Sequence, residues 1–166
     1  MTIDKEMYAL AERLGAALRQ RGWMAATAES CTGGWIGQAI TMVPGSSEWF
    51  DCGFITYTNR AKMTLLDVSA DTLQTQGAVS EATVREMVAG ALRHSGAHVA
   101  VAVSGVAGPA GGTTAKPVGT VWLAWGLRGG GIEAQTVCFP GDRDAVRRLT
   151  VMQALEGLRA RAANAP

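Results

Sequence analysis

The stretch TAESCTGGWIG, residues 27–37, gathers residue types that nucleophilic chemistry needs. Ser30 and Cys31 are candidate nucleophiles, and Thr32 and Gly33 follow where an apolar strand is expected to give way to a helix. Amide N–H groups at a helix start carry roughly half a positive charge, so they bind anions and can stabilise an oxyanion. Serine and threonine are also common N-caps. The stretch therefore predicts either a catalytic turn or an ordinary helix cap.

A second candidate is YTNRAK, residues 57–62. If Tyr57 ends a strand and Lys62 lies on the first turn of the next helix, both side chains reach one cleft. A lysine with a lowered pKa can act as the base for a serine, and a tyrosine can relay or orient the proton. Tyrosine and lysine are also common on solvated surfaces, so the motif alone leaves both interpretations open.

A third candidate is SGVAGPAGGTTAKPVG, residues 104–119, which we call the glycine loop. It follows an apolar strand, at the position where ligands bind in open α/β sheets, and its glycines allow backbone amides to approach a phosphate or ribose. It lacks the GKS or GKT of a Walker loop, and no helix begins directly after it. The alternative is a mobile surface loop. The candidate binding residues are Gly105, Gly108, Gly111, Gly112 and Thr113.

Composition limits the class of protein. The 166 residues carry 15 basic and 14 acidic side chains for a net charge of +1, so a nucleic-acid partner is not expected. The N-terminus has charges where a signal peptide needs an apolar core, and no apolar run is long enough to span a membrane. We expect a single cytoplasmic domain over residues 1–166.

Cysteines and histidines are few. Cys31, Cys52 and Cys138 are odd in number and widely separated, and only His94 and His98 accompany them, so neither a disulfide framework nor a metal site is expected. The cysteines are predicted to be buried free thiols. The chain has no G-x-S-x-G elbow and too few histidines for a Ser-His-Asp triad.

Hydrophobic patterning predicts an α/β protein. The chain is expected to form a three-layer α/β/α sandwich with a mixed, mostly parallel sheet of about five strands. The stretch LRGGG, residues 127–131, predicts a hairpin between the last two strands, which should therefore pair antiparallel. Strands are expected at 23–28, 49–58, 98–104, 118–125 and 132–139. Helices are expected at 7–18, 35–43, 61–66 and 69–76, from Ser80 and Glu81 to a stop at Gly96, and after Asp142, with residues 162–166 as a frayed tail.

These motifs, taken in order, resemble one known family. TAESCTGGWIGQAIT, GFITYTNRAKMTLLDV, GAVSEATVREMV, AVSGVAGPAGGTTAKPVGTVWLAW and FPGDRDAVRRLTV are similar to the CinA C-terminal domain family, the nicotinamide mononucleotide (NMN) deamidases. The resemblance spans nearly the whole chain. It also suggests the stand-alone form, because the domain that precedes this one in full-length CinA proteins is not seen.

The resemblance implies hydrolysis of the NMN carboxamide to nicotinate mononucleotide and ammonia, in pyridine nucleotide recycling and without a cofactor or metal. The family places the nucleophile at Ser30, assisted by Tyr57 and Lys62. Lys62 would take the serine proton directly or through Tyr57, and the amides of Cys31 to Gly33 would face the oxyanion.

The substrate phosphate is expected at the glycine loop, from Gly108 to Thr113, with Arg143 as a second contact. Arg143 capping the last helix, or pairing with an acid, is an equal alternative. Two other functions stay open: a catalytically silent nucleotide-binding module, and an interaction module of the kind that the family's link to competence suggests. Five tryptophans in a small domain favour a homo-oligomer, most simply a dimer.

Overall fold

A five-stranded mixed sheet forms the middle layer of the protein in the computed structural model, which describes residues 4–166. The strand order is β2-β1-β3-β4-β5. β1 pairs parallel with β2 and β3, whereas β4 pairs antiparallel with β3 and β5, so within the described residues only β4 runs against the other strands. The strands are β1 (Ala25–Glu29), β2 (Phe50–Ile55), β3 (Val99–Gly105), β4 (Thr120–Leu127) and β5 (Ile132–Cys138).

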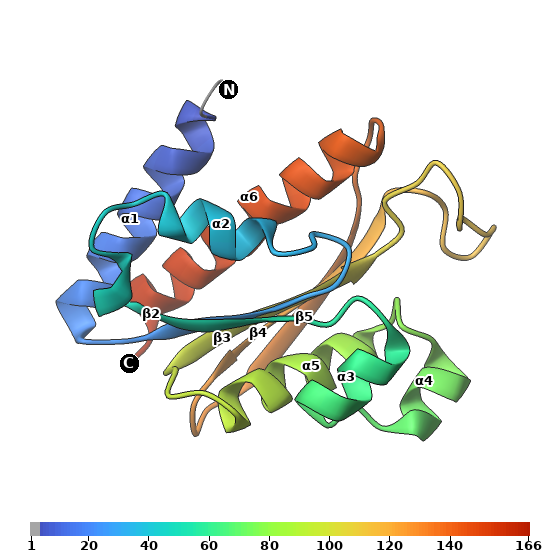
Figure 1. Cartoon of the computed structure of the whole chain (residues 1–166), viewed down its shortest axis with the longest axis horizontal. Helices are drawn as coiled ribbons and strands as arrows, with labels where there is room; N and C mark the ends of the chain where they lie inside the picture. The colour runs from blue at the N-terminus through green and yellow to red at the C-terminus, as the bar shows by residue number, and fades with distance from the viewer. Residues whose placement is uncertain (1–3) are drawn as a thin grey trace.

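Helices cover both faces of this sheet, as Figure 1 shows. One face carries α1 (Lys5–Arg21), α2 (Trp35–Thr41) and α6 (Arg143–Asn164), and the other carries α3 (Asn59–Leu66), α4 (Ala70–Gln76) and α5 (Glu81–Arg93). Each face has its own cluster of buried apolar side chains. The predicted three-layer α/β/α sandwich is therefore confirmed, and so is the antiparallel hairpin of β4 and β5.

The central strands place the candidate residues at one edge of the sheet. All five residues of β1 are buried, as are the first six of β3, because both strands are covered on both faces. β1 ends directly before Ser30, and its parallel neighbour β3 ends at Gly105. Their carboxyl ends therefore meet, at the edge where ligand sites form in such sheets.

Several local expectations need correction. β2 is shorter than the predicted 49–58, because Trp49 ends a 3-10 turn and Tyr57 lies in the connection to α3. The predicted frayed tail is mostly helical: α6 runs through Asn164, and Ala162 is buried in the apolar core on that face. None of the helices in residues 4–166 has both the length and the apolar character that a membrane crossing requires.

The prediction of three buried thiols is correct for Cys31 alone. Cys52 packs against the core but is partly exposed, because its strand β2 lies at one edge of the sheet. Cys138 is exposed, because it lies on the other edge strand, β5, at a position that faces solvent. All three cysteines are free.

Candidate active site

A cavity of about 300 Å³ opens at the carboxyl edge of β1 and β3. It brings together residues from segments far apart in the sequence: the turn after β1, the start of α3, the α4–α5 connection, the end of β3 and the start of α6. Its lining residues are Ser30, Cys31, Tyr57, Asn59, Lys62, Ala78, Val79, Ser104, Gly105, Ala107 and Arg143.

Ser30 and Lys62 are in direct contact in this cavity. Lys62 Nζ lies 2.8 Å from Ser30 Oγ and donates a second hydrogen bond of 2.7 Å to the carbonyl oxygen of Thr56. Both side chains are buried, with Lys62 only 1% exposed. A neutral amine in this position donates to Thr56 and turns its lone pair to the serine hydroxyl.

Burial also changes the acidity of the lysine. Desolvation of its ammonium form lowers the pKa of Lys62 to about 8. A substantial fraction of the side chain is therefore neutral in mildly alkaline solution, as a general base requires.

Helix α3, which carries Lys62, is fixed at both of its ends. Thr58 caps the start by accepting a hydrogen bond from the amide of Ala61, and Asp67 ends the helix in the left-handed conformation. The amide of Asp67 donates to the carbonyl of Lys62 itself. The backbone of the candidate base is thus tied directly to the residue that terminates its helix.

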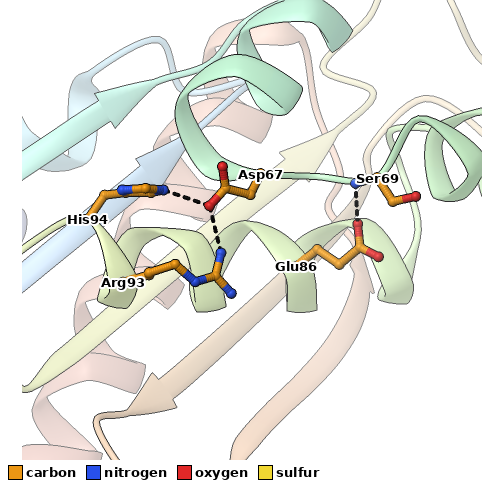
Figure 2. Close-up of polar contacts among 5 residues, drawn as sticks. All are labelled: Asp67, Ser69, Glu86, Arg93 and His94. Carbon is orange, nitrogen blue, oxygen red and sulfur yellow. Dashed lines mark hydrogen bonds and ion pairs between the residues drawn. The ribbon is translucent and has the colours of Figure 1, made fainter.

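Polar contacts fasten this helix end to α5, as Figure 2 shows. The Asp67 carboxylate binds His94 at 2.6 Å and Arg93 at 2.7 Å, and these hydrogen bonds lower the pKa of Asp67. Two residues later, the amide of Ser69 donates to Glu86 at 2.9 Å. The contacts of Asp67 and those of Ser69 thus both join the α3–α4 connection to α5.

A glycine lets helices α3 and α5 approach closely next to these contacts. A Cβ atom on Gly90 of α5 would lie 2.0 Å from the carbonyl oxygen of Leu66, the last residue of α3. Such a clash with backbone cannot be relieved by a side-chain rotation. The small residue at position 90 therefore sets how near the lysine-bearing helix lies to the core.

Glu29 organises the other half of the site, the nucleophile turn (residues 29–37). Its side chain is 1% exposed and accepts hydrogen bonds from donors on both sides of Ser30. Oε1 accepts from Thr32 Oγ1 (2.7 Å) and the amides of Gly34 (3.2 Å) and Ile36 (2.9 Å); Oε2 accepts from the amide of Gly37 (3.0 Å) and from Thr27 Oγ1 (3.4 Å).

The turn leaves few amides open for an oxyanion. The Gly33 amide, one of the three predicted donors, instead bonds with the carbonyl of Ser30 at 3.1 Å. The amides of Cys31 and Thr32 have no hydrogen-bond partner in the part of the chain that the structure describes, and Cys31 lines the cavity. Arg147 fixes the outer side by donating to the carbonyls of Cys31 (3.0 Å) and Thr32 (3.1 Å).

The neighbouring thiol is unsuited to be the nucleophile. Burial, together with the nearby negative charge of Glu29, raises the pKa of Cys31 to about 11. Because the thiolate is the reactive form, Cys31 is inert near neutral pH.

Tyr57 and Arg143 form a separate pair at the rim of the cavity. Arg143 donates to the Tyr57 hydroxyl at 3.1 Å and to the carbonyl of Gly108 at 2.8 Å. Tyr57 is 60% exposed and has no hydrogen bond with Ser30 or Lys62 among the described residues. The cap of α6 is Asp142, not Arg143, since Asp142 accepts from the amide of Ala145.

A larger cavity of about 650 Å³ lies on the other side of Arg143. Both cavities share Ala107 and Arg143, so they are neighbours, and Arg147 also lines the larger one. Of the predicted loop residues, Gly105 lines the smaller cavity and Gly108 binds Arg143. Three others, Gly111, Gly112 and Thr113, are exposed and line neither cavity.

Sequence reasoning missed two contributors to this site. Glu29 stood inside the first motif, where an acidic residue at the end of an apolar strand was the available signal. For Arg147 the sequence offered no such signal, because its hydrogen-bond partners are backbone carbonyls more than a hundred residues away. Within residues 4–166 there is no group of three or more His, Cys, Asp or Glu side chains able to hold a metal ion.

Comparison with known proteins identifies the family to which the chain belongs. The CinA C-terminal domain family matches residues 7–162. The nicotinamide-nucleotide amidohydrolase PncC of Escherichia coli (strain K12) is 52% identical over 156 residues, covering 93% of this chain and 94% of the relative, and PncC of Pseudomonas putida is 56% identical over 149 residues, covering 90% and 92%.

Solved structures show the same fold. The crystal structure of the competence/damage inducible protein CihA from Agrobacterium tumefaciens has a TM-score of 0.94 and 45% sequence identity, and the match covers 96% of this chain and 98% of that one. On the family match and these identities, the chain belongs to the CinA C-terminal domain family.

Proposed function

We propose that this protein is an NMN amidohydrolase that uses Ser30 as its nucleophile and Lys62 as its base. The observation that carries the proposal is the 2.8 Å contact between Ser30 Oγ and a buried Lys62 Nζ, in a chain whose relatives are named nicotinamide-nucleotide amidohydrolases. The products are nicotinate mononucleotide and ammonia.

The first half of the reaction forms an acyl-enzyme. Ser30 Oγ attacks the carboxamide carbon while its proton passes to neutral Lys62 Nζ. The amide of Cys31 donates to the oxyanion, a contribution worth about 3 kcal/mol per donor in other acyl-transfer enzymes. The C–N bond then breaks, and the departing nitrogen takes the proton from Lys62 and leaves as ammonia.

The second half releases the acid. Water gives a proton to Lys62 and attacks the ester carbon, after which the bond to Ser30 Oγ breaks and the serine recovers its proton. Direct transfer between Ser30 and Lys62 needs no relay through Tyr57, whose hydroxyl is already bonded to Arg143. Tyr57 instead borders the bound substrate.

Arg143 is the proposed phosphate contact. It lies between the two cavities and has no ion-pair partner among the described acids, so its charge is available to a substrate anion. The carboxamide then lies at Ser30, and the larger cavity receives the ribose phosphate. Gly105 lines the smaller cavity and Gly108 holds Arg143 through its carbonyl, whereas Gly111, Gly112 and Thr113 border neither cavity and are assigned no contact with the nucleotide.

A homodimer is part of the proposal. The exposed large apolar side chains of residues 4–166 all lie on one stretch that includes the end of edge strand β2 and helix α3: Ile55, Tyr57, Met63 and Leu65. Such a concentration is typical of an interface. A dimer by light scattering that becomes a monomer in Leu65→Glu would support it, and a monomeric native protein would reject it.

A cytoplasmic location is also proposed, because a charged nucleotide does not cross a bilayer unaided. Recovery of the activity with the cytoplasmic fraction of fractionated cells supports this location, and recovery with another fraction rejects it.

Ammonia release from NMN tests the function. The native protein and Cys31→Ala should release ammonia in the presence of a chelator, and Ser30→Ala should not. Binding of NMN without ammonia release by the native protein would instead support a silent nucleotide-binding module. Activity that survives Ser30→Ala would reject the serine mechanism.

A further inference from the structure

We propose that Glu29 is a positioning residue, which holds Ser30 toward Lys62 and keeps the Cys31 amide open to the substrate. It touches no substrate, because its side chain is 1% exposed and does not line the cavity. The inference rests on the proposed function in one respect, the role of Ser30 as nucleophile.

Many donors converge on the Glu29 carboxylate. Five hydrogen bonds reach it, three from amides at the start of α2 and two from threonine hydroxyls. A glutamine at position 29 has only one acceptor oxygen. Its NH₂ group, a donor, would therefore face either the amide N–H of Gly37 or the amide N–H groups of Gly34 and Ile36, which are donors as well. The geometry of the turn thus depends on a carboxylate and not only on a side chain of that size.

Glu29 is connected with both reacting groups, Ser30 and Lys62. Its side chain shapes the turn that begins with the next residue, Ser30. Its backbone carbonyl accepts a hydrogen bond of 2.8 Å from the amide of Thr56, and the carbonyl of Thr56 accepts one of 2.7 Å from Lys62 Nζ. A movement of Glu29 therefore shifts the nucleophile and the base relative to each other.

Glu29 also determines where an anion can bind in the turn. The amides at a helix start attract a negative group, and here the carboxylate of Glu29 already occupies that place. A substrate phosphate is thereby excluded from the start of α2. The amide of Cys31 stays unpaired beside Ser30, where an oxyanion forms, and the substrate anion is left to Arg143 at the other wall.

Glu29→Gln tests the proposal, with Glu48→Gln as the matched control because Glu48 is exposed on a neighbouring turn. Two rates are measured: kcat for ammonia release from NMN, and phosphonylation of Ser30 by a small fluorophosphonate, which needs an activated serine but no nucleotide. We expect both rates to fall about 10²-fold in Glu29→Gln and to stay within about twofold in the control. The Kd of NMN, measured in the Ser30→Ala background, should change by less than about threefold.

A second variant covers the case in which Glu29→Gln does not fold. Thr32→Val removes one donor to Glu29 at nearly constant volume and should slow both rates about tenfold, again with little change in Kd. Thr41→Val, on the exposed side of α2, is its control and should be neutral.

Rates in Glu29→Gln that stay within about threefold of the native rates would overturn the proposal. Equal losses of rate and of NMN binding in both variants would also overturn it, because they would indicate a residue needed only for folding. If the native protein releases no ammonia while Ser30 is still phosphonylated, the proposed substrate is wrong, and the phosphonylation ratio alone decides the role of Glu29.

Discussion

The nucleophile turn and the outer part of the glycine loop, residues 109–115, lie at the same end of the sheet but are held very differently. Within the turn, Glu29 accepts hydrogen bonds from Thr32 and from the start of α2, Arg147 binds it from outside, and Ser30 and Thr32 are buried. Residues 109–115 are all exposed, and the loop projects from the body of the protein (Figure 1). Directly after this segment, Lys116 donates a hydrogen bond of 3.0 Å to the carbonyl of Gln76.

This difference separates the two tasks of the site. Chemistry needs reacting atoms held within a fraction of an ångström, and the turn together with α3 supplies that rigidity. Binding residues are often carried by exposed, more mobile loops, and residues 109–115 are of that kind. Changes on the rigid side should therefore lower kcat, and changes on the loop side should raise KM.

The largest effect is expected from the base. Lys62→Met keeps the length and the apolar stem of the side chain but removes the amine, so kcat should fall by about 10⁴-fold with little change in NMN affinity. Steady-state kinetics measures kcat, and calorimetry measures the affinity for NMN. Lys5→Met, on an exposed position of α1, is the control, and comparable activity in both variants would contradict the role of Lys62.

The next effect concerns how α3 is placed. Gly90→Ala inserts a Cβ atom 2.0 Å from the carbonyl of Leu66, which must push α3 away from α5 and Lys62 away from Ser30. We expect about a 10-fold to 100-fold loss of kcat and a loss of about 2 kcal/mol in the free energy of unfolding.

For Gly90→Ala, denaturant unfolding measures the loss of stability, and steady-state kinetics measures the loss of kcat. Gly131→Ala is a suitable control, because its Cβ meets nothing within 4 Å. Native kcat in Gly90→Ala would mean that the close helix contact has no part in placing the lysine.

On the loop side, Arg143→Met should mainly weaken substrate binding. It removes the charge between the two cavities, so KM for NMN should rise about 10-fold to 30-fold, while kcat changes by less than about threefold. Arg159→Met, whose side chain pairs with Glu156 on α6, is the control. A fall in kcat at unchanged KM would mean that Arg143 acts in the chemical step, which would contradict the separation of catalysis and binding between the two regions.

The smallest effect is expected for Tyr57→Phe. Its hydroxyl binds Arg143 and not Ser30 or Lys62, so its loss should lower kcat/KM by less than about tenfold. A proton relay through Tyr57 would instead make the loss about 10³-fold or more. The same assay therefore separates direct transfer from the relay.

Much of this architecture could be predicted from the sequence, for physical reasons. The apolar run from His98 to Ser104 and the spacing of Val84, Met87 and Val88 reflect burial that the structure bears out. The residue types of Ser30 and Lys62 left a catalytic and a structural interpretation open, and the resemblance to the family implied the catalytic one. Their direct contact depends on how β1 and α3 are placed together, which local patterns do not encode.

The remaining features are long-range. Gly90 resembles any helical glycine until α3 is known to cross it, and Arg143 finds its partners on loops 35 and 86 residues away. Cys138 belongs to an apolar pattern, but its strand lies at the edge of the sheet and leaves it exposed. Such features follow from packing and strand order, which the hydrophobic period alone does not fix.

The pH dependence of kcat/KM for ammonia release tests the central claim, that a neutral Lys62 activates Ser30. Burial lowers the pKa of Lys62 to about 8, and the neutral amine is the active form. The activity should therefore rise tenfold per pH unit in more acidic solution and level off above about pH 8, with one ionisation. Glu48→Gln should follow the same curve. A rate that is constant through this range, or one that keeps rising toward the ordinary lysine pKa of about 10.4, would contradict the account.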